Sequence, residues 1–210
     1  MIRVFIADDH AIVREGVKRI ISDADDMCVA GEAADGPELL ALVAGDGVDV
    51  VLLDLAMPGM GGLEVIQQIH QRKPRLAVLV VSMHAADQYA VRAIKAGAAG
   101  YINKGRPPKE LLAAIRTVAA GRHYISPDVA ESLAAHLLTD TSKLPHESLS
   151  NREYEVLCLI ASGKSVGDIA EELSLSIKTV STYRGRILGK LGLRHNAELM
   201  RYALAHGLVE

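Results

Sequence analysis

From residue 1 to residue 120, short apolar runs alternate with amphipathic stretches. Five runs are rich in Val, Ile and Leu and apolar nearly throughout, as strands buried on both faces should be: Val4–Ala7, Met27–Ala30, Val48–Leu53, Leu76–Val81 and Ala98–Ile102. Between them, apolar residues are spaced for one helical face, such as Leu63, Ile66 and Ile69. This alternation predicts an α/β domain with a doubly wound, five-stranded parallel sheet.

The pattern changes after Gly121, which ends the last of these helices. One more helix is predicted near residues 127–138. The polar segment Thr139–Glu147 has no apolar face, as is typical of a linker. We therefore predict a first domain over residues 1–121 and a linker over residues 122–147.

Residues 148–210 contain no strand-like run and predict an all-α domain of four helices. Ser150, with Glu153 three residues later, forms a capping-box pattern at the start of the first helix. The other three are predicted over Ser165–Leu173, Ser176–Leu191 and Asn196–His206. A short helix, a tight turn and a longer helix in this order predict a helix-turn-helix.

The composition is that of an ordinary globular protein, with 50% hydrophobic residues, 23% charged residues and a net charge of −3. Only 3% of residues are aromatic, which argues against a base-stacking platform. Cys28 and Cys158 have no metal-type spacing, which favours a reduced chain. No uncharged apolar stretch approaches the roughly 18 residues of a membrane span. We expect a cytoplasmic protein with no membrane partner.

Polar residues follow four of the five apolar runs: Asp8 and Asp9, then Asp54, Ser82 and Lys104. The second run is the exception and ends in Gly31 and Glu32. Because the carboxyl ends of parallel strands meet at one edge of the sheet, we expect these polar side chains to converge. Three carboxylates at close quarters need a cation, and their hard oxygens suit Mg²⁺.

Several of these residues also have ordinary structural interpretations. Asp9 taken alone could cap the helix that starts near Ala11, and Lys104 alone could be a solvated loop residue. The joint arrangement at successive strand ends favours a functional site. Asp8-Asp9-His10 stands where a glycine-rich phosphate loop would begin, which argues against a nucleotide-binding enzyme.

Four motifs of the first domain resemble the receiver domain of two-component response regulators: VFIADDH, DVVLLDLAMPGMGGLE, VLVVSMH and AGAAGYINKG. The resemblance implies a flavodoxin-like fold and a regulator rather than an enzyme. It implies that Asp54 accepts a phosphoryl group from a histidine kinase. It also implies that Asp9, Asp54 and the backbone carbonyl of Ala56 hold Mg²⁺, assisted by Asp8.

The same resemblance assigns roles to three further residues. Lys104 would pair with the phosphoryl oxygens, Ser82 would hydrogen-bond to the phosphoryl group, and Tyr101 matches the aromatic residue that changes rotamer with Ser82. Gly105 departs from the family, which often has a cis proline directly after the lysine. Ala56 is also smaller than the residue often found there, which leaves the lifetime of the phosphorylated state open.

The segment from Ser174 to Arg194 carries five basic residues and no acidic one, as is typical of a phosphate-binding surface. A solvated helix face is the alternative. The motifs LSNREYEVL, DIAEELSLSIKTVSTYRGRI and KLGLRHNAEL resemble the LuxR-type DNA-binding domain. Together with a receiver, the chain is similar to the NarL/FixJ group, and its segment TVSTYRGRI resembles the GacA/UvrY-like members of that group.

This second resemblance implies double-stranded promoter DNA as a partner, read by a homodimer, with RNA polymerase as a candidate further partner. Ser181 and Thr182 would lie near base edges and Lys178 and Thr179 near phosphates, while Gly185 replaces a base-reaching lysine of several relatives. The remaining basic candidates for DNA contacts are Arg184, Arg186 and Lys190. The last helix would form the dimer through Leu199, Tyr202, Ala203 and His206.

Three other interpretations compete with this one. A haloacid-dehalogenase-like phosphohydrolase would need a second Asp where Ala56 stands. A small-molecule-sensing LuxR-type regulator would need an apolar pocket in place of the acidic residues. The third alternative is a scaffold whose helical domain binds only protein, and a gel shift with promoter DNA would separate it from a regulator.

Overall fold

The computed structural model describes residues 1–45, 47–82, 86–126, 129–130 and 144–209. The chain divides into two compact units, residues 1–135 and 136–210. In the part of the chain that is described, no helix is long and apolar enough to cross a membrane. The predicted helix near residues 127–138 lies almost wholly outside the described residues.

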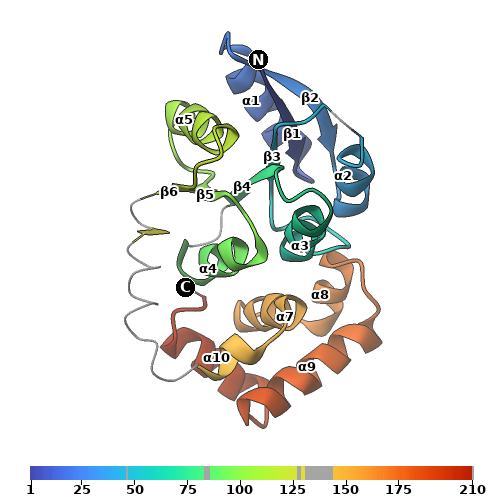
Figure 1. Cartoon of the computed structure of the whole chain (residues 1–210). Coiled ribbons are helices and arrows are strands. Elements are labelled where there is room, and N and C mark those ends of the chain that lie inside the picture. The colour runs from blue at the N-terminus through green and yellow to red at the C-terminus, as the bar shows by residue number, and fades with distance from the viewer. Residues whose placement is uncertain (46, 83–85, 127–128, 131–143, 210) are drawn as a thin grey trace. The chain divides into compact units, whose positions relative to one another are not determined.

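The first unit is built on a six-stranded parallel sheet with the order β2-β1-β3-β4-β5-β6 (Figure 1). Its strands are β1 (Ile2–Ala7), β2 (Met27–Ala33), β3 (Val50–Leu53), β4 (Ala77–Ser82), β5 (Gly100–Asn103) and β6 (Tyr124–Ile125). Its helices are α1 (Ala11–Ser22), α2 (Gly36–Leu42), α3 (Gly62–Arg72), α4 (Ala86–Ala96) and α5 (Pro108–Ala119). The parallel α/β fold predicted from the sequence is confirmed.

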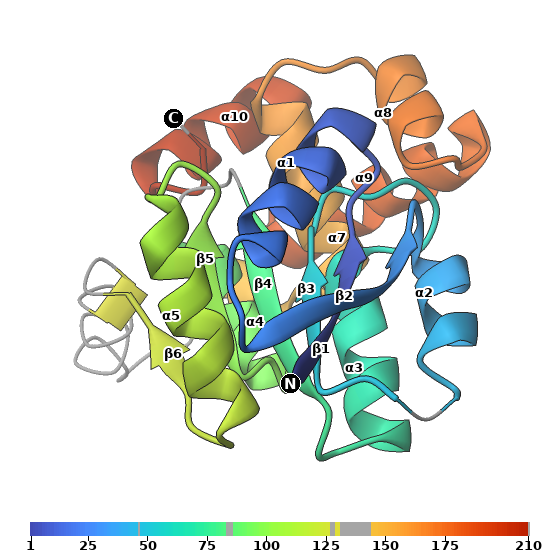
Figure 2. The same cartoon turned by 90° about the horizontal axis from the view of Figure 1, so that it is seen from above.

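Two apolar layers hold the helices against the sheet. One layer joins α1 and α5 to one face through residues such as Ile21 and Ile115, and the other joins α2, α3 and α4 to the opposite face through residues such as Leu39 and Ile66. Figures 1 and 2 show this division of the helices. The central strands β3 and β4 are buried throughout, which explains why their runs are apolar at every position.

The predicted strand count of five is one too low. Residues 124 and 125 form β6, in which Tyr124 and Ile125 pair with Gly100 and Tyr101 of β5. A two-residue strand is too short to show a hydrophobic period, so the sequence pattern did not reveal it.

The second unit consists of a short 3-10 helix and four α-helices: η1 (Pro145–Ser148), α7 (Asn151–Ala161), α8 (Val166–Glu172), α9 (Ile177–Leu191) and α10 (Asn196–Ala205). The capping box of Ser150 and Glu153 at the start of α7 is confirmed. The turn between α8 and α9 passes through Ser174, which has a φ of 52°. Its backbone is held by a hydrogen bond from Leu175 N–H to the carbonyl of Ala170 at 2.8 Å.

The end of the predicted linker is part of this second unit. Residues 145–147 fold into η1, and His146 is buried, with 2% of its surface exposed. Its Nδ1 atom lies 2.9 Å from the Tyr202 hydroxyl of α10. This polar segment therefore packs against the unit through the imidazole of His146. A search for apolar periodicity does not detect such a contact.

Candidate functional site

Strand pairing brings the acidic residues of the first unit together. Ala7 at the end of β1 is in register with Leu53 at the end of β3, and the Asp54 N–H donates to the carbonyl of Ala7 at 2.8 Å. Asp8 and Asp54 therefore leave adjacent strands side by side. Both residues are buried, each with 3% of its surface exposed.

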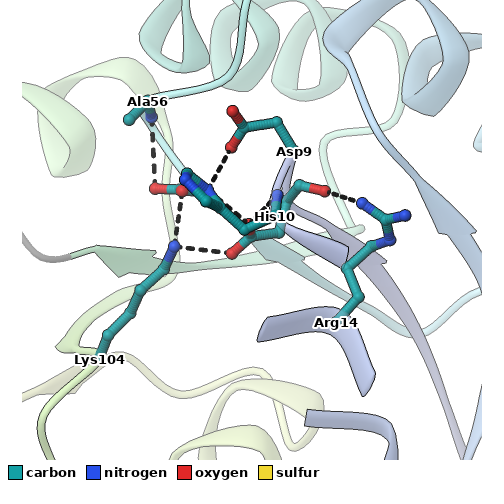
Figure 3. A network of polar contacts seen from close by, with 7 residues as sticks. Asp9, His10, Arg14, Ala56 and Lys104 are labelled. Carbon is teal, nitrogen blue, oxygen red and sulfur yellow. Dashed lines mark hydrogen bonds and ion pairs between the residues drawn. The ribbon is translucent and has the colours of Figure 1, made fainter. Parts of the chain in front are cut away.

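Lys104 lies between these two carboxylates (Figure 3). Its Nζ atom donates to Asp54 Oδ2 at 2.6 Å and to Asp8 Oδ2 at 2.7 Å. Burial lowers the pKa of Lys104, but the hydrogen bonds to Asp54 and Asp8 outweigh it and leave that pKa above its ordinary value. The ammonium therefore stays charged and offsets part of the negative charge of the cluster.

Asp9 brings a third carboxylate to the cluster. Its Oδ1 atom is buried and accepts no hydrogen bond from the described residues, although it lies 2.8 Å from Nδ1 of His10. Ligand atoms of Asp8, Asp9, His10 and Asp54 all lie within 4.8 Å of one another. His10 was not predicted as part of this site, although the Asp-Asp-His sequence placed it next to the acidic pair.

The alternative role of Asp9 as a helix cap is wrong. Helix α1 begins after His10, which is the N-cap residue and makes no side-chain capping bond. The Asp8 carboxylate instead turns back on the backbone, because the His10 N–H donates to its Oδ1 atom at 2.8 Å. Asp9 is thus left facing the cluster (Figure 3).

Ser82 and Tyr101 lie at the same end of the sheet and are both fully buried. Burial raises the pKa of Tyr101 to about 12, against the opposing effect of a hydrogen bond with the Ser82 side chain. The Lys104 N–H donates to the carbonyl of Ser82 at 2.9 Å, so β4 and β5 fix Ser82 and Lys104 together.

The loops that follow β3 and β5 carry the two residues that depart from the family, Ala56 and Gly105. The described residues contain no cis peptide bond, so the bond between Lys104 and Gly105 is trans. The Ala56 N–H donates to Asp54 Oδ1 at 3.3 Å. Of the predicted site residues in the first unit, Asp8, Asp9, Asp54, Ala56, Ser82, Tyr101 and Lys104 are thus gathered at one edge of the sheet.

In the second unit, α9 has the buried face and the exposed face of a recognition helix. Val180, Ile187 and Leu188 are buried, whereas four predicted DNA contacts are exposed: Lys178, Ser181, Thr182 and Arg186. Thr179 is half-buried, and its backbone N–H donates to the Ser176 hydroxyl that caps the helix. Ile177, which is 62% exposed, was not predicted as part of this surface.

Two predicted DNA contacts make side-chain contacts within the unit, although Lys190 stays exposed. Arg184 is half-buried, and its Nε atom donates to the Asn196 side chain at the start of α10. The Lys190 ammonium pairs at 2.6 Å with Glu153, a carboxylate that is only 3% exposed. The sequence shows only that all four residues are basic, so it could not distinguish Arg184 and Lys190, which have partners in the unit, from Lys178 and Arg186.

The predicted dimer residues need a correction. Leu199 and Ala203 are fully buried inside the unit, on a helix that packs against α7, so their side chains are not available to a partner. The ring of Tyr202 stacks on that of His206, with centroids 4.1 Å apart. Leu204, one position beyond Ala203 and off the buried stripe, is 58% exposed and was missed.

Comparisons with known proteins agree with both units. Residues 4–116 match the response regulator receiver domain, and residues 147–203 match the bacterial regulatory proteins of the luxR family. The chain belongs to the two-component response regulators, which makes it a phosphorylation-regulated, DNA-binding transcription regulator. The predicted class of protein is confirmed.

Full-length relatives place the chain in the NarL/FixJ group of these regulators. It is 38% identical over 209 residues to the response regulator UvrY of Escherichia coli K12, covering 99% of this chain and 96% of UvrY. It is 41% identical over 211 residues to the response regulator GacA of Pseudomonas aeruginosa PAO1, covering 100% and 99%. A solved structure of RcsB from Salmonella enterica serovar Typhimurium, bound to promoter P1flhDC with BeF3⁻, is 29% identical with a TM-score of 0.62, covering 96% and 97%.

Proposed function

We propose that Asp54 is the phosphoacceptor and that a histidine kinase supplies the phosphoryl group. The observation that carries this proposal is the pairing of the buried Asp54 carboxylate with the Lys104 ammonium at 2.6 Å. A carboxylate reacts with a phosphoryl group only where the incoming charge is balanced, so catalysis consists of positioning and electrostatics. Among the described residues, Lys104 is the ammonium that pairs with Asp54.

In the transfer, an Asp54 oxygen forms a bond to phosphorus while the P–N bond of the donor phosphohistidine breaks, and its electron pair stays on the imidazole nitrogen. The Lys104 ammonium lies close enough to Asp54 to meet the new phosphoryl oxygens. The Ser82 hydroxyl, held at the end of β4, is the neutral donor for the same group.

The acidic residues fit Mg²⁺. Asp8, Asp9 and Asp54 supply carboxylate oxygens, which are the ligands this hard cation prefers, and the backbone carbonyl of Ala56 would complete the set. The convergence of ligand atoms of Asp8, Asp9, His10 and Asp54 within 4.8 Å of one another supports a cation at this place, and the buried Asp9 Oδ1 atom accepts no hydrogen bond from the described residues, although it lies 2.8 Å from Nδ1 of His10. When bound, Mg²⁺ supplies positive charge to the phosphoryl oxygens.

For the second unit, we infer that α9 enters the major groove of promoter DNA and that two copies of the chain bind together. Lys178 and Arg186 are the exposed basic residues for phosphate contacts, and Ser181 and Thr182 face the bases. Because Leu199 and Ala203 are buried, the exposed Leu204 is the better candidate for the dimer contact on α10. Binding at a promoter makes RNA polymerase a natural further partner.

The phosphoacceptor is tested with acetyl phosphate and Mg²⁺ on a phosphate-affinity gel. We expect the wild type to be retarded and Asp54→Asn to run as unmodified protein. Asp49→Asn is the matched control, since Asp49 lies before β3 and pairs with Arg3 away from the cluster. Phosphorylation of Asp54→Asn to the wild-type extent would show that the assignment is wrong. A gel shift with promoter DNA then distinguishes a regulator from a protein-binding scaffold.

A further inference from the structure

Arg14 of α1 holds the backbone of the acidic loop. Its Nη1 atom donates to the carbonyl oxygen of Asp8 at 2.6 Å, and its Nε atom donates to Glu32 Oε2 at 3.3 Å (Figure 3 shows the first contact). The Arg14 side chain is 18% exposed. Glu32 comes from the end of β2, the one strand end whose polar residue had no assigned role.

The bonded carbonyl belongs to the peptide that joins Asp8 to Asp9. β1 ends at Ala7, so this carbonyl lies beyond the strand and meets Arg14 instead. Since a peptide unit is rigid and planar, a rotation of this one would reorient the attachment of both carboxylates at once. Holding it fixes the directions of Asp8 and Asp9 together.

Glu32 in turn holds Arg14. Its second oxygen accepts from Lys18 at 3.2 Å, so two cations of α1 converge on one carboxylate. The hydrogen bonds from Lys18 and Arg14 keep the pKa of Glu32 below its ordinary value. Ion pairs this exposed add little stability, so their effect is expected in the geometry of the loop more than in the fold.

We propose that Arg14 is a positioning residue for phosphoryl transfer, which aims the Asp8 and Asp9 carboxylates at the cation site by fixing the peptide between them. The inference rests on the proposed function of Asp54. Small displacements of ligands and reacting groups cost large factors in rate, so loss of this contact should weaken cation binding and slow phosphorylation.

The test uses the full-length chain and compares Arg14→Met with the wild type. Mg²⁺ binding is measured by calorimetry, phosphorylation by acetyl phosphate at saturating Mg²⁺, and stability by thermal unfolding. We expect the Kd for Mg²⁺ to rise about tenfold and the maximal rate to fall about tenfold, with the KM for acetyl phosphate within about twofold, because Arg14 does not touch the donor. Arg14→Lys should restore part of both losses.

Arg116→Met is the matched control, because Arg116 makes a two-bond pair with Asp26, which lies before β2 at the opposite edge of the sheet. It should leave Mg²⁺ binding and phosphorylation unchanged. A Kd and rate for Arg14→Met within about twofold of the wild type would overturn the proposal.

Two further variants keep the outcome decisive. If Arg14→Met does not fold, Glu32→Gln keeps Arg14 but weakens its anchor, and an unchanged Kd for Mg²⁺ in that variant would overturn the proposal instead. Asp54→Asn separates the two hypotheses. If it is still phosphorylated, the phosphoacceptor is wrong, whereas the role of Arg14 is judged from the Kd for Mg²⁺ alone.

Discussion

At the scale of single residues, Ser82 has one partner in the structure, Tyr101, and would gain a second if Asp54 were phosphorylated. It is fully buried and hydrogen-bonds with the side chain of Tyr101, which is also fully buried. A phosphoryl group on Asp54 would bring up to two negative charges and new acceptor oxygens into the same space. The Ser82 hydroxyl would then be drawn toward those oxygens, so phosphorylation would change the surroundings of Tyr101 through Ser82.

The burial of Tyr101 predicts a loss of stability at alkaline pH. Its pKa is about 12 in the folded chain, against about 10 in the unfolded chain. The unfolded state therefore releases the proton first, and this contribution to stability is present below about pH 10 and is lost as the pH rises toward 12. Between about pH 9 and about pH 11, the free energy of unfolding of the wild type should fall by about 1.3 kcal/mol more than that of Tyr101→Phe. Equal losses in urea titrations of the two proteins would contradict the assignment.

At the scale of elements, α9 combines exposed basic residues with a basic residue that binds the neighbouring helix α7. The exposed side carries Lys178 and Arg186, whereas Lys190 pairs with the buried Glu153 of α7. Glu153 also accepts from the Ser150 N–H at 2.7 Å, so one carboxylate both caps α7 and binds the far end of α9. The orientation of α9 thus depends on a capping residue of its neighbour.

Because Arg186 is exposed and Lys190 pairs with Glu153, replacing each of them by Met should affect a different property of the protein. Arg186→Met should leave the unfolding temperature unchanged and reduce the slope of log K against log salt by about 1, as expected for one lost phosphate contact. Lys190→Met should destabilise the unit by about 1 kcal/mol, because the Glu153 carboxylate keeps its Ser150 N–H donor but loses the half-exposed ammonium that pairs with it. Thermal unfolding and salt titrations of DNA binding on both variants are the measurements. If both variants changed stability and the salt dependence of binding alike, the distinction between Arg186 as a DNA contact and Lys190 as a structural residue would be wrong.

The same elements show what a sequence can and cannot predict. The runs of β1 to β5 and the capping box at Ser150 follow from local rules, since hydrophobic period and caps involve residues close together in the chain. The pairing of Lys190 with Glu153 joins residues 37 positions apart, and the contact of Arg14 with the Asp8 carbonyl depends on the path of the backbone. Such contacts depend on packing between elements, which residue type alone does not encode.

At the scale of the whole molecule, the charge of the chain limits how it can bind DNA. Residues 144–210 carry as many acidic as basic side chains, and two of the five cations from Ser174 to Arg194 already contact other residues of the unit. Each neutralised phosphate contributes only about 0.9 to the salt slope of binding, so a unit with few exposed cations should bind weakly as a single copy. Two copies on a pseudo-palindromic site would supply the missing affinity.

Two routes from phosphorylation to DNA binding give opposite results for the isolated segment of residues 143–210. If the unphosphorylated receiver covers the recognition helix, the isolated segment should bind promoter DNA as well as phosphorylated full-length protein without any phosphoryl donor. If phosphorylation acts by dimerising receivers, the segment should bind more weakly, and fusing it to an unrelated dimer should restore binding. We expect the second result, because only a few cations of α9 are exposed and one of them, Lys190, is paired with Glu153. Strong binding by the monomeric segment at physiological salt would instead show that the receiver acts by covering the helix.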